Sequence, residues 1–277
     1  MSPIVDPNRE FINKWEMYKL LIRHPVKNVQ IPETQLYSTE SLSSMLMKYP
    51  VLYIKPIASW GGTDISTLQL NENSYIWRVQ GKDSVILDDF NEIYHQIGEF
   101  YQDTNIIIQR GIPTIRYDNQ PFDIRSHLYK EMDGSWLYGG NLVRIGGAGS
   151  IVSNIEISNG TVKPTDEVIS ALFPNQPFSI DTLKTISMDI CHMLDQYHFF
   201  TEVGIDFGLD HDGNLWIIEV NTDDTQGCPD PYLFSLLPDQ TSYNQIIQHK
   251  AKIYENWMRH MIDSFEAYLT EKSKKTD

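Results

Sequence analysis

The stretch GIDFGLDHDGNLWIIEVNTD, residues 204–223, decides the fold. Apolar and polar residues alternate on both sides of an Asp-Gly pair at 212–213, which predicts two antiparallel strands joined by a tight turn. Side chains two residues apart share a face of a strand, so Glu219 and Asn221 lie together. The turn brings Asp206 opposite position 219. The hairpin therefore gathers two carboxylates and an amide at one end of a sheet.

This set of oxygen donors suits Mg²⁺, which keeps several waters and shares the phosphates of a nucleotide. A carboxylate among apolar neighbours is costly to bury without a cation partner. We therefore predict that Asp206, Glu219 and Asn221 are metal ligands. The alternative is a surface hairpin with an ordinary acidic face.

The composition limits the class of protein and of partner. Of the 277 residues, 41% are hydrophobic and 21% are charged, which is the balance of a globular protein with a substantial core. The formal net charge of −15 would repel a phosphate backbone, so we expect no nucleic acid partner. The sequence contains no long apolar run and no signal-peptide pattern, which predicts no membrane partner and a cytoplasmic location. Two cysteines, Cys191 and Cys228, are too few for a disulfide framework.

Hydrophobic periodicity predicts an α+β protein. The expected helices cover residues 8–25, 39–48, 90–101, 181–197 and 246–265. The expected strands cover residues 51–54, 66–70, 74–80, 84–87, 106–109, 122–130, 136–144, 150–157, 202–209 and 215–220.

Three of the helices carry more detailed expectations. The first should bury one face made of Phe11, Trp15, Tyr18, Leu21 and Ile22. The helix that begins near 181 should have Asp181 as its N-cap, because a short acidic side chain satisfies free backbone N–H groups. The last helix has an aromatic stripe, which we expect to pack back on the body as core. The alternative is that the stripe is a surface for a partner.

With these elements placed, the hairpin resembles the metal-binding end of ATP-grasp enzymes, in which an Asp is followed on the next strand by Glu-x-Asn. The stretch YIKPIASWGGTDI, residues 53–65, resembles the strand-Lys-Pro and phosphate loop of that superfamily. The resemblance implies that Lys55 contacts the α- and β-phosphates of ATP. Gly61 and Gly62 would let backbone N–H groups approach those phosphates.

Two further resemblances concern the rest of the nucleotide site. NIIIQRGIP, residues 105–113, is similar to the superfamily's hinge strand, which implies that the backbone around Gln109, Arg110 and Ile112 reads the adenine edge. PFDIRSHLY, NLVRIGG and SIVSNIE resemble the pattern Asp-x-Arg, Arg, Asn of ATP-grasp ligases that act on peptides and amino acids.

That pattern falls on four residues of this sequence. It implies that Arg125 and Arg144 hold the transferred phosphoryl group, for which a forked guanidinium is suited, and it assigns Asp123 and Asn154 to the nucleotide site. The alternative is that Asp123 and Arg125 belong to cross-strand surface pairs and that Arg144 is solvated.

Together with NKWEMYKLL at 13–21 and IPETQLYS at 31–38, these stretches resemble the YheC/YheD-type, endospore coat-associated ATP-grasp family, from about Phe11 to Arg259. Three features depart from its pattern. Trp60 lies in the phosphate loop, no Gly-Gly follows Asn154, and Thr-Asp-Asp occupies 222–224.

The resemblance implies an ATP-grasp fold, in which two α+β subdomains grip a nucleotide between antiparallel sheets. It divides the chain into an N-terminal helical segment (1–50), a small subdomain with the phosphate loop (51–108) and a large subdomain with the metal site and the C-terminal helix (109–277).

The implied activity is an ADP-forming ligase that uses ATP and two Mg²⁺ ions to join a carboxylate, through an acyl phosphate, to an amine or similar nucleophile. The substrate is then a peptide or an amino acid. The alternatives are an ATP-dependent phosphotransferase and a non-catalytic, spore-associated nucleotide-binding protein, which would change the expected location to the spore. The sequence leaves the oligomeric state, the two substrates and a substrate-recognising partner protein open.

Overall fold

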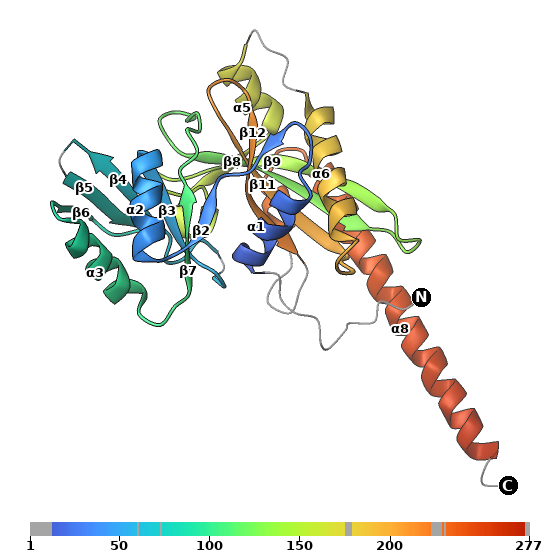
Figure 1. The fold of residues 1–277 in the computed structure, drawn as a ribbon. Coiled ribbons are helices and arrows are strands. Elements are labelled where there is room, and N and C mark those ends of the chain that lie inside the picture. The colour runs from blue at the N-terminus through green and yellow to red at the C-terminus, as the bar shows by residue number, and fades with distance from the viewer. Residues whose placement is uncertain are drawn as a thin grey trace.

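The computed structural model describes residues 13–59, 61–72, 74–174, 179–222, 229 and 231–274. Two six-stranded sheets lie beside each other, each with helices against it (Figure 1). Five positions to which the sequence pointed lie outside the described residues: Phe11, Trp60, Asp223, Asp224 and Cys228.

The larger sheet has the strand order β1-β12-β11-β8-β9-β10. Its strands are β1 (Val29–Gln30), β8 (Phe122–Lys130), β9 (Trp136–Ile145), β10 (Thr161–Lys163), β11 (Glu202–Leu209) and β12 (Leu215–Thr222). The helices that accompany it are α1 (Lys14–Arg23), α4 (Ile155–Ser158), α5 (Thr165–Leu172), α6 (Ile180–Leu194), α7 (Tyr232–Ser235) and α8 (Thr241–Lys274).

The smaller sheet has the order β2-β7-β3-β4-β5-β6 and its own core. It comprises β2 (Thr34–Leu36), β3 (Val51–Pro56), β4 (Ser66–Asn71), β5 (Ser74–Val79), β6 (Ser84–Leu87) and β7 (Ile106–Arg110), with α2 (Thr39–Lys48) and α3 (Phe90–Tyr101). Helix α3 begins where the Asp89 side chain accepts two backbone N–H groups, and it buries Ile93, Ile97 and Tyr101 at helical spacing.

The described part of residues 1–50 contributes to both layers. Helix α1 packs into the core of the larger sheet, and β1 pairs with β12 in parallel. Strand β2 pairs with β7, and α2 packs in the core of the smaller sheet. The chain therefore passes from the larger layer to the smaller one and returns after β7.

Most predicted elements are present within a few residues of their predicted bounds, and Cys191 is buried in the larger core as expected. The predicted strand over 150–157 is wrong. Residues 150–153 are irregular and α4 follows them. The apolar run that suggested a strand instead folds over the cavity between the sheets, where Ile151 N–H donates to the Gln80 side chain.

Two helical details also differ. Helix α1 buries Met17 and Leu21, whereas the predicted face member Ile22 is 48% exposed and Trp15 and Tyr18 are only half-buried. Helix α6 begins at Ile180, and its N-cap is Ser179, two residues before the predicted cap Asp181. The face of α1 was chosen by periodicity, which leaves the rotation of the helix on the sheet undetermined. The cap of α6 was misassigned because serine and aspartate are both favoured at the N-cap.

The last helix differs most from its prediction. Among the α8 side chains that the structure describes, only Ile246 and His249 are buried, and Tyr254 and Phe265 are each 63% exposed. The prediction that the aromatic stripe belongs to the core was therefore wrong, because α8 continues beyond the body instead of lying along it (Figure 1). Across the described residues, no helix combines the length and apolar character needed to cross a bilayer.

Candidate active site

The hairpin of β11 and β12 has the predicted register. Asp206 lies directly opposite Glu219, and Gly204 lies opposite Asn221. An irregularity between Asp206 and Phe207 shifts the register beyond that point. On the other side of β11, strand β8 places Arg125 beside Asp206. The sheet therefore brings a predicted metal ligand and a predicted phosphoryl contact together.

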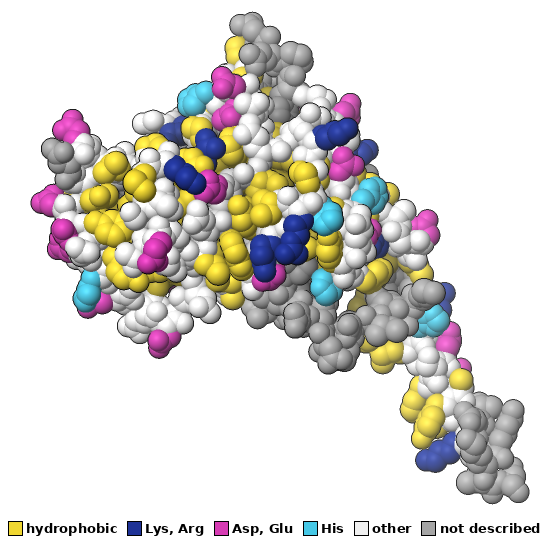
Figure 2. Space-filling view, viewed as in Figure 1, with side chains coloured by type: hydrophobic (Ala, Val, Ile, Leu, Met, Phe, Trp, Pro, Cys, Tyr) yellow, Lys and Arg dark blue, Asp and Glu magenta, His cyan; other side chains and the backbone are white. Residues whose placement is uncertain are grey.

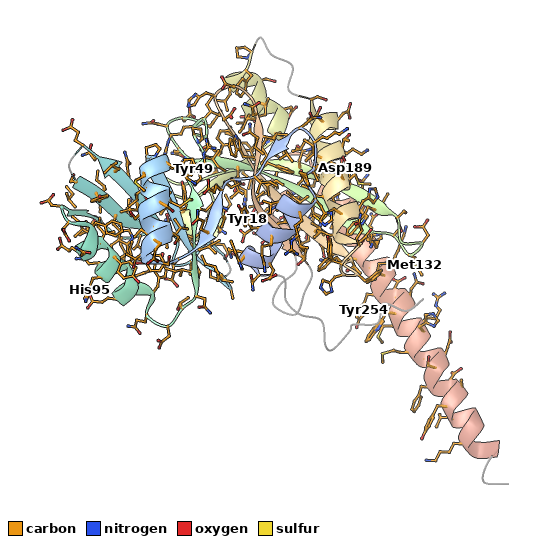
Figure 3. The ribbon with its side chains drawn as sticks, viewed as in Figure 1. Tyr18, Tyr49, His95, Met132, Asp189 and Tyr254 are labelled. Carbon is orange, nitrogen blue, oxygen red and sulfur yellow. The ribbon has the colours of Figure 1, made fainter. Side chains whose placement is uncertain are left out.

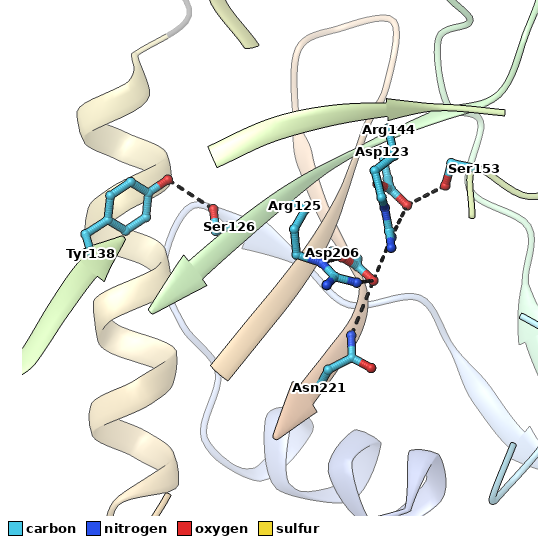
Figure 4. A network of polar contacts seen from close by, with 8 residues as sticks. All are labelled: Asp123, Arg125, Ser126, Tyr138, Arg144, Ser153, Asp206 and Asn221. Carbon is cyan, nitrogen blue, oxygen red and sulfur yellow. Dashed lines mark hydrogen bonds and ion pairs between the residues drawn. The ribbon is translucent and has the colours of Figure 1, made fainter. Parts of the chain in front are cut away.

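Two arginines converge on Asp206 (Figure 4). Arg125 Nη2 lies 3.0 Å from Asp206 Oδ2, and Arg125 Nε contacts the other carboxylate oxygen. Arg144 Nη2 lies 2.8 Å from Asp206 Oδ2. Asn221 Nδ2 donates to the same oxygen at 3.4 Å. The Asp206 carboxylate thus forms the centre of a buried network.

Arg144 is held in place from its other side. Its Nε and Nη2 atoms donate to the two carboxylate oxygens of Asp123 at 2.7 and 2.6 Å, and Ser153 Oγ also contacts Asp123. Asp123, Arg125, Arg144 and Asp206 are all buried. This burial excludes the alternative in which they form surface pairs with a solvated Arg144.

Burial and neighbouring charges set the ionisation of the two aspartates. Burial acts to raise the pKa of Asp206, but the Arg125 and Arg144 guanidinium groups outweigh it and hold that pKa below its ordinary value. Burial raises the pKa of Asp123, with a contribution from the Asp206 charge, although Arg144 opposes the shift. The charges of two arginines and two aspartates therefore balance each other in this buried network.

Lys55 approaches this network from the smaller sheet. It lies on β3, is 7% exposed, and its Nζ donates to Gln109 Oε1 at 2.6 Å. Burial lowers the pKa of Lys55 to about 8, while the nearby Glu219 and Asp206 carboxylates oppose the shift. A buried ammonium across from two carboxylates is placed to meet an anionic ligand between the sheets.

Sequence reasoning missed Lys14, the first residue of α1. Its Nζ lies 3.1 Å from Glu219 Oε1 and 2.5 Å from the Ser59 carbonyl oxygen next to the phosphate loop. The helix therefore ties a predicted metal ligand to that loop. No motif marks such a lysine, because its role arises only from packing of α1 against both layers.

The two glycines of the predicted phosphate loop have positive φ values. Gly61 and Gly62 have φ values of 67° and 78°, in the left-handed region that favours glycine. A Cβ on Gly62 would lie 2.9 Å from Ile157 Cδ1 and 3.5 Å from Asn154 Cβ. The loop therefore packs closely against the segment that carries Asn154.

The segment 149–157 bridges the two layers over the cavity. The Tyr53 hydroxyl donates to the Ile151 carbonyl at 3.2 Å, and Gln80 Oε1 accepts from Ile151 N–H at 3.0 Å. Arg78 also contacts the Gly149 carbonyl. Contacts from two strands of the smaller sheet thus position a segment that follows β9 of the larger one.

Part of the backbone of the predicted hinge is hydrogen-bonded within the protein. The backbone N–H groups of Arg110 and Gly111 donate to the carbonyls of Glu33 and Val51, each at 2.8 Å. The Arg110 guanidinium lies between the rings of Tyr49 and Trp216, 5.0 and 4.8 Å from their centroids. These two amides are therefore occupied, and Ile112 is the hinge residue at which we propose that the backbone meets a nucleotide base.

One cavity of about 300 Å³ connects these features. All thirteen predicted site residues line it: Lys55, Gly61, Gly62, Gln109, Arg110, Ile112, Asp123, Arg125, Arg144, Asn154, Asp206, Glu219 and Asn221. Lys14, Tyr53 and Ser153 line the same cavity and were not predicted. The structure thus brings residues from distant parts of the sequence to one place between the sheets.

Comparison with known proteins agrees with this architecture. The family model described as YheC/D-like ATP-grasp matches residues 5–250. The chain belongs to this family. It is 28% identical over 225 residues to the endospore coat-associated protein YheD of Bacillus subtilis (strain 168), covering 78% of this chain and 49% of YheD.

The endospore coat-associated protein YheC of Bacillus subtilis (strain 168) is 27% identical over 237 residues, covering 80% of this chain and 65% of YheC. The chain thus spans about half of YheD and 65% of YheC.

Two solved structures are similar at low identity. The D-alanine–D-alanine ligase of Coxiella burnetii has a TM-score of 0.47 and 14% identity, covering 92% of this chain and 61% of that one. The ATP-grasp ligase PsnB, in complex with minimal precursor, Mg and ADP, has a TM-score of 0.47 and 10% identity, covering 87% and 58%.

The donor chemistry of the cavity fits Mg²⁺, which the family generally uses. Asp206, Glu219 and Asn221 supply two carboxylates and an amide. In the part of the chain that the structure describes, no three or more His, Cys, Asp and Glu side chains form a cage for a metal ion. Mg²⁺ needs no such cage, because it takes the rest of its octahedron from water and phosphate oxygens.

Proposed function

We propose that the chain is an ADP-forming ligase that activates a carboxylate as an acyl phosphate and transfers the acyl group to an amine or similar nucleophile. The observation that carries the proposal is the pair of buried arginines on Asp206, in the same cavity as Lys55 and the phosphate loop. Anion-binding groups from both sheets meet where the γ-phosphate of a nucleotide would react.

The nucleotide would bind between the sheets. Lys55 and the amides of Gly61 and Gly62 would contact the α- and β-phosphates, and Ile112 would meet the base. Asp206, Glu219 and Asn221 would hold Mg²⁺, which neutralises charge on the phosphate oxygens when bound. The Lys14 contacts to Glu219 and Ser59 would position that glutamate relative to the loop.

The two arginines would serve the transfer itself. A substrate carboxylate oxygen attacks the γ-phosphorus, the bond to the β–γ bridging oxygen breaks, and ADP leaves. Arg125 and Arg144 use Nε and Nη2 for the aspartates, so their Nη1 donors are available to equatorial phosphoryl oxygens. Asp123 fixes Arg144 and acts as a positioning residue, not as a nucleotide contact.

The second step would occur at the same arginines. The nucleophile attacks the acyl carbon, inorganic phosphate leaves, and the proton of an attacking amine passes to solvent. The negative charge that develops on the acyl oxygen would be stabilised by the guanidinium groups. No protein side chain forms a covalent bond with the substrate in this scheme.

We infer an amino acid or a peptide as substrate, because the Asp123, Arg125, Arg144 and Asn154 pattern resembles that of ligases with such substrates. Arg125 Nη1 lies over Gly204, where an added Cβ would be 3.3 Å from it and 3.0 Å from Pro229. Pro229, Thr222 and Leu233 line this end of the cavity, so we place the acceptor there. We also propose a spore-associated location, because the curated relatives are named for the endospore coat.

Trapping with hydroxylamine tests the chemistry. The chain is incubated with ATP, Mg²⁺, hydroxylamine and a panel of amino acids and peptides whose carboxylates carry ¹⁸O. The proposal predicts a hydroxamate, equimolar ADP, and transfer of one ¹⁸O atom to phosphate. Phosphorylation of a hydroxyl without hydroxamate would indicate the phosphotransferase instead. ATP binding with no ADP formed across the panel would favour a non-catalytic protein.

Two matched variants connect that chemistry to the site. Glu219→Gln should abolish ADP formation with an unchanged circular dichroism spectrum. Asp212→Asn changes an exposed carboxylate in the turn of the same hairpin and should leave activity unchanged. Equal activity of Glu219→Gln and the unmodified chain would contradict the assignment of Glu219.

A further inference from the structure

Helix α8 has two parts with different surroundings. In the first part, Ile246 and His249 are buried, His249 Nε2 lies 3.0 Å from the Lys130 carbonyl, and Lys250 Nζ lies 2.7 Å from Glu202 Oε2. Asn256 Nδ2 still lies 2.8 Å from Met132 Sδ, and beyond this contact the helix leaves the body and projects from it (Figure 1). The projecting part lies largely beyond residues 5–250, over which the family model matches. It is therefore an addition to the nucleotide-binding body.

The projecting part carries a continuous apolar stripe. At 100° per residue, its large apolar side chains fall within a sector of about 140° on one side of the helix. The members of this stripe are Tyr254, Trp257, Met258, Met261, Ile262, Phe265, Tyr268 and Leu269, with exposed fractions between 37% and 63%. Figure 2 shows apolar side chains along this helix, and Figure 3 shows Tyr254 standing away from it.

The stripe is large enough to form a stable interface. Large side chains offer about 150–250 Å² each, so eight of them at about half exposure present on the order of 800 Å². A stable protein interface buries about 800 Å² on each partner. The stripe runs for roughly 24 Å along the helix at 1.5 Å per residue. A second helix of the same length would cover it.

The charges beside the stripe identify the second helix. Glu255, Arg259 and Glu266 lie along the same edge, with Arg259 and Glu266 two turns apart, whereas Ser264 and His260 lie along the other edge. In an antiparallel pair of identical helices, like edges meet, so Arg259 of each copy faces Glu266 of the other. In a parallel pair, unlike edges meet, and these opposite charges do not come together.

The charge of the body favours the same orientation. Each chain carries a formal net charge of −15. A parallel pair would place two such bodies at the same end of the helices, whereas an antiparallel pair places them at opposite ends, where their repulsion is weaker. We propose that α8 pairs in antiparallel orientation with α8 of a second copy of this chain, through the stripe Tyr254–Leu269.

The mass of the full chain in solution tests the pairing. Sedimentation equilibrium should give twice the chain mass of 32.1 kDa. Trp257→Glu combined with Phe265→Glu should give a monomer. Ala267→Glu, which adds one carboxylate on the opposite face, should remain dimeric. A monomeric unmodified chain at concentrations up to about 100 µM would overturn the proposal. So would a dimer that survives the paired Glu substitutions.

A charge exchange tests the orientation. Arg259→Glu and Glu266→Arg should each raise the dimer dissociation constant about tenfold, because each places like charges opposite one another at two points. The double variant should return the constant to within about threefold of the original. A double variant weaker than both single variants would contradict the antiparallel arrangement. Circular dichroism of each variant separates loss of pairing from loss of the helix.

Discussion

Replacing Lys55 by methionine should make the protein without nucleotide more stable and unable to bind nucleotide. Lys55 has an ordinary pKa of 10.5 that burial lowers to about 8 in the folded chain. Below pH 8 both folded and unfolded chains carry this proton, so the folded state bears the full cost of a buried ammonium. Between pH 8 and 10.5 the folded chain releases the proton that the unfolded chain keeps. The free energy of unfolding therefore rises with pH over this range.

The difference in pKa sets the size of the effect. Each pH unit corresponds to about 1.4 kcal/mol, so the cost of the ammonium approaches about 3 kcal/mol below pH 8. The methionine also removes the donor to Gln109 Oε1, which offsets about 1–2 kcal/mol of the gain. We therefore expect Lys55→Met to raise the free energy of unfolding at pH 7 by about 1–2 kcal/mol, and the advantage to shrink as pH rises towards 10.

Urea unfolding of the two proteins at pH 7 and pH 9.5 measures this difference, with the exposed Lys184→Met as control. Nucleotide binding by Lys55→Met should fall at least about a hundredfold, because a charged contact to phosphate is lost. The reasoning would be refuted if Lys55→Met were less stable than the unmodified chain at pH 7. A stability difference that does not change with pH would refute it as well.

Three further substitutions test the parts that surround the cavity. Asp123→Ala leaves Arg144 without its bidentate partner, and we expect a loss of about 3–5 kcal/mol in urea unfolding, against little change for the exposed Asp83→Ala. Gly62→Ala places a Cβ 2.9 Å from Ile157 at a positive φ, so it should lower the free energy of unfolding by about 1–3 kcal/mol and weaken nucleotide binding. The control Gly81→Ala has a similar φ but open space around its Cβ, so it should lower stability less and leave binding unchanged. Arg110→Ala removes the guanidinium between Tyr49 and Trp216, so it should lower the free energy of unfolding by about 1–2 kcal/mol and change the fluorescence emission of Trp216. Unchanged emission would contradict that placement of Arg110.

The hairpin could be predicted from the sequence because its pattern is local. Alternation fixes which side chains share a face, and the Asp-Gly turn fixes the register, so Asp206 lies opposite Glu219 as expected. Lys55, Gly61 and Gly62 could be placed because they belong to short motifs with a known order along the chain. The position of each residue within such a short motif predicts its place in the site.

Other features depend on packing between distant segments. Lys14 reaches Glu219 only because α1 docks against both layers, and no local pattern specifies that contact. The pairing of Arg144 with Asp123 required the register of β8 and β9, which the sequence pattern alone did not set. Periodicity predicted that α8 has an apolar face, but it could not predict which part of the protein covers that face. The stripe that was expected to be core is exposed.

The central claim is that ATP and Mg²⁺ bind between the two sheets. Titration of the chain with Mg·ADP tests this claim most directly. Calorimetry should show one nucleotide per chain in the presence of Mg²⁺, much weaker binding without it, and no Mg²⁺ dependence in Glu219→Gln. The absence of binding at nucleotide concentrations well above about 1 mM would contradict the claim. An affinity that is the same with and without Mg²⁺ would also contradict it.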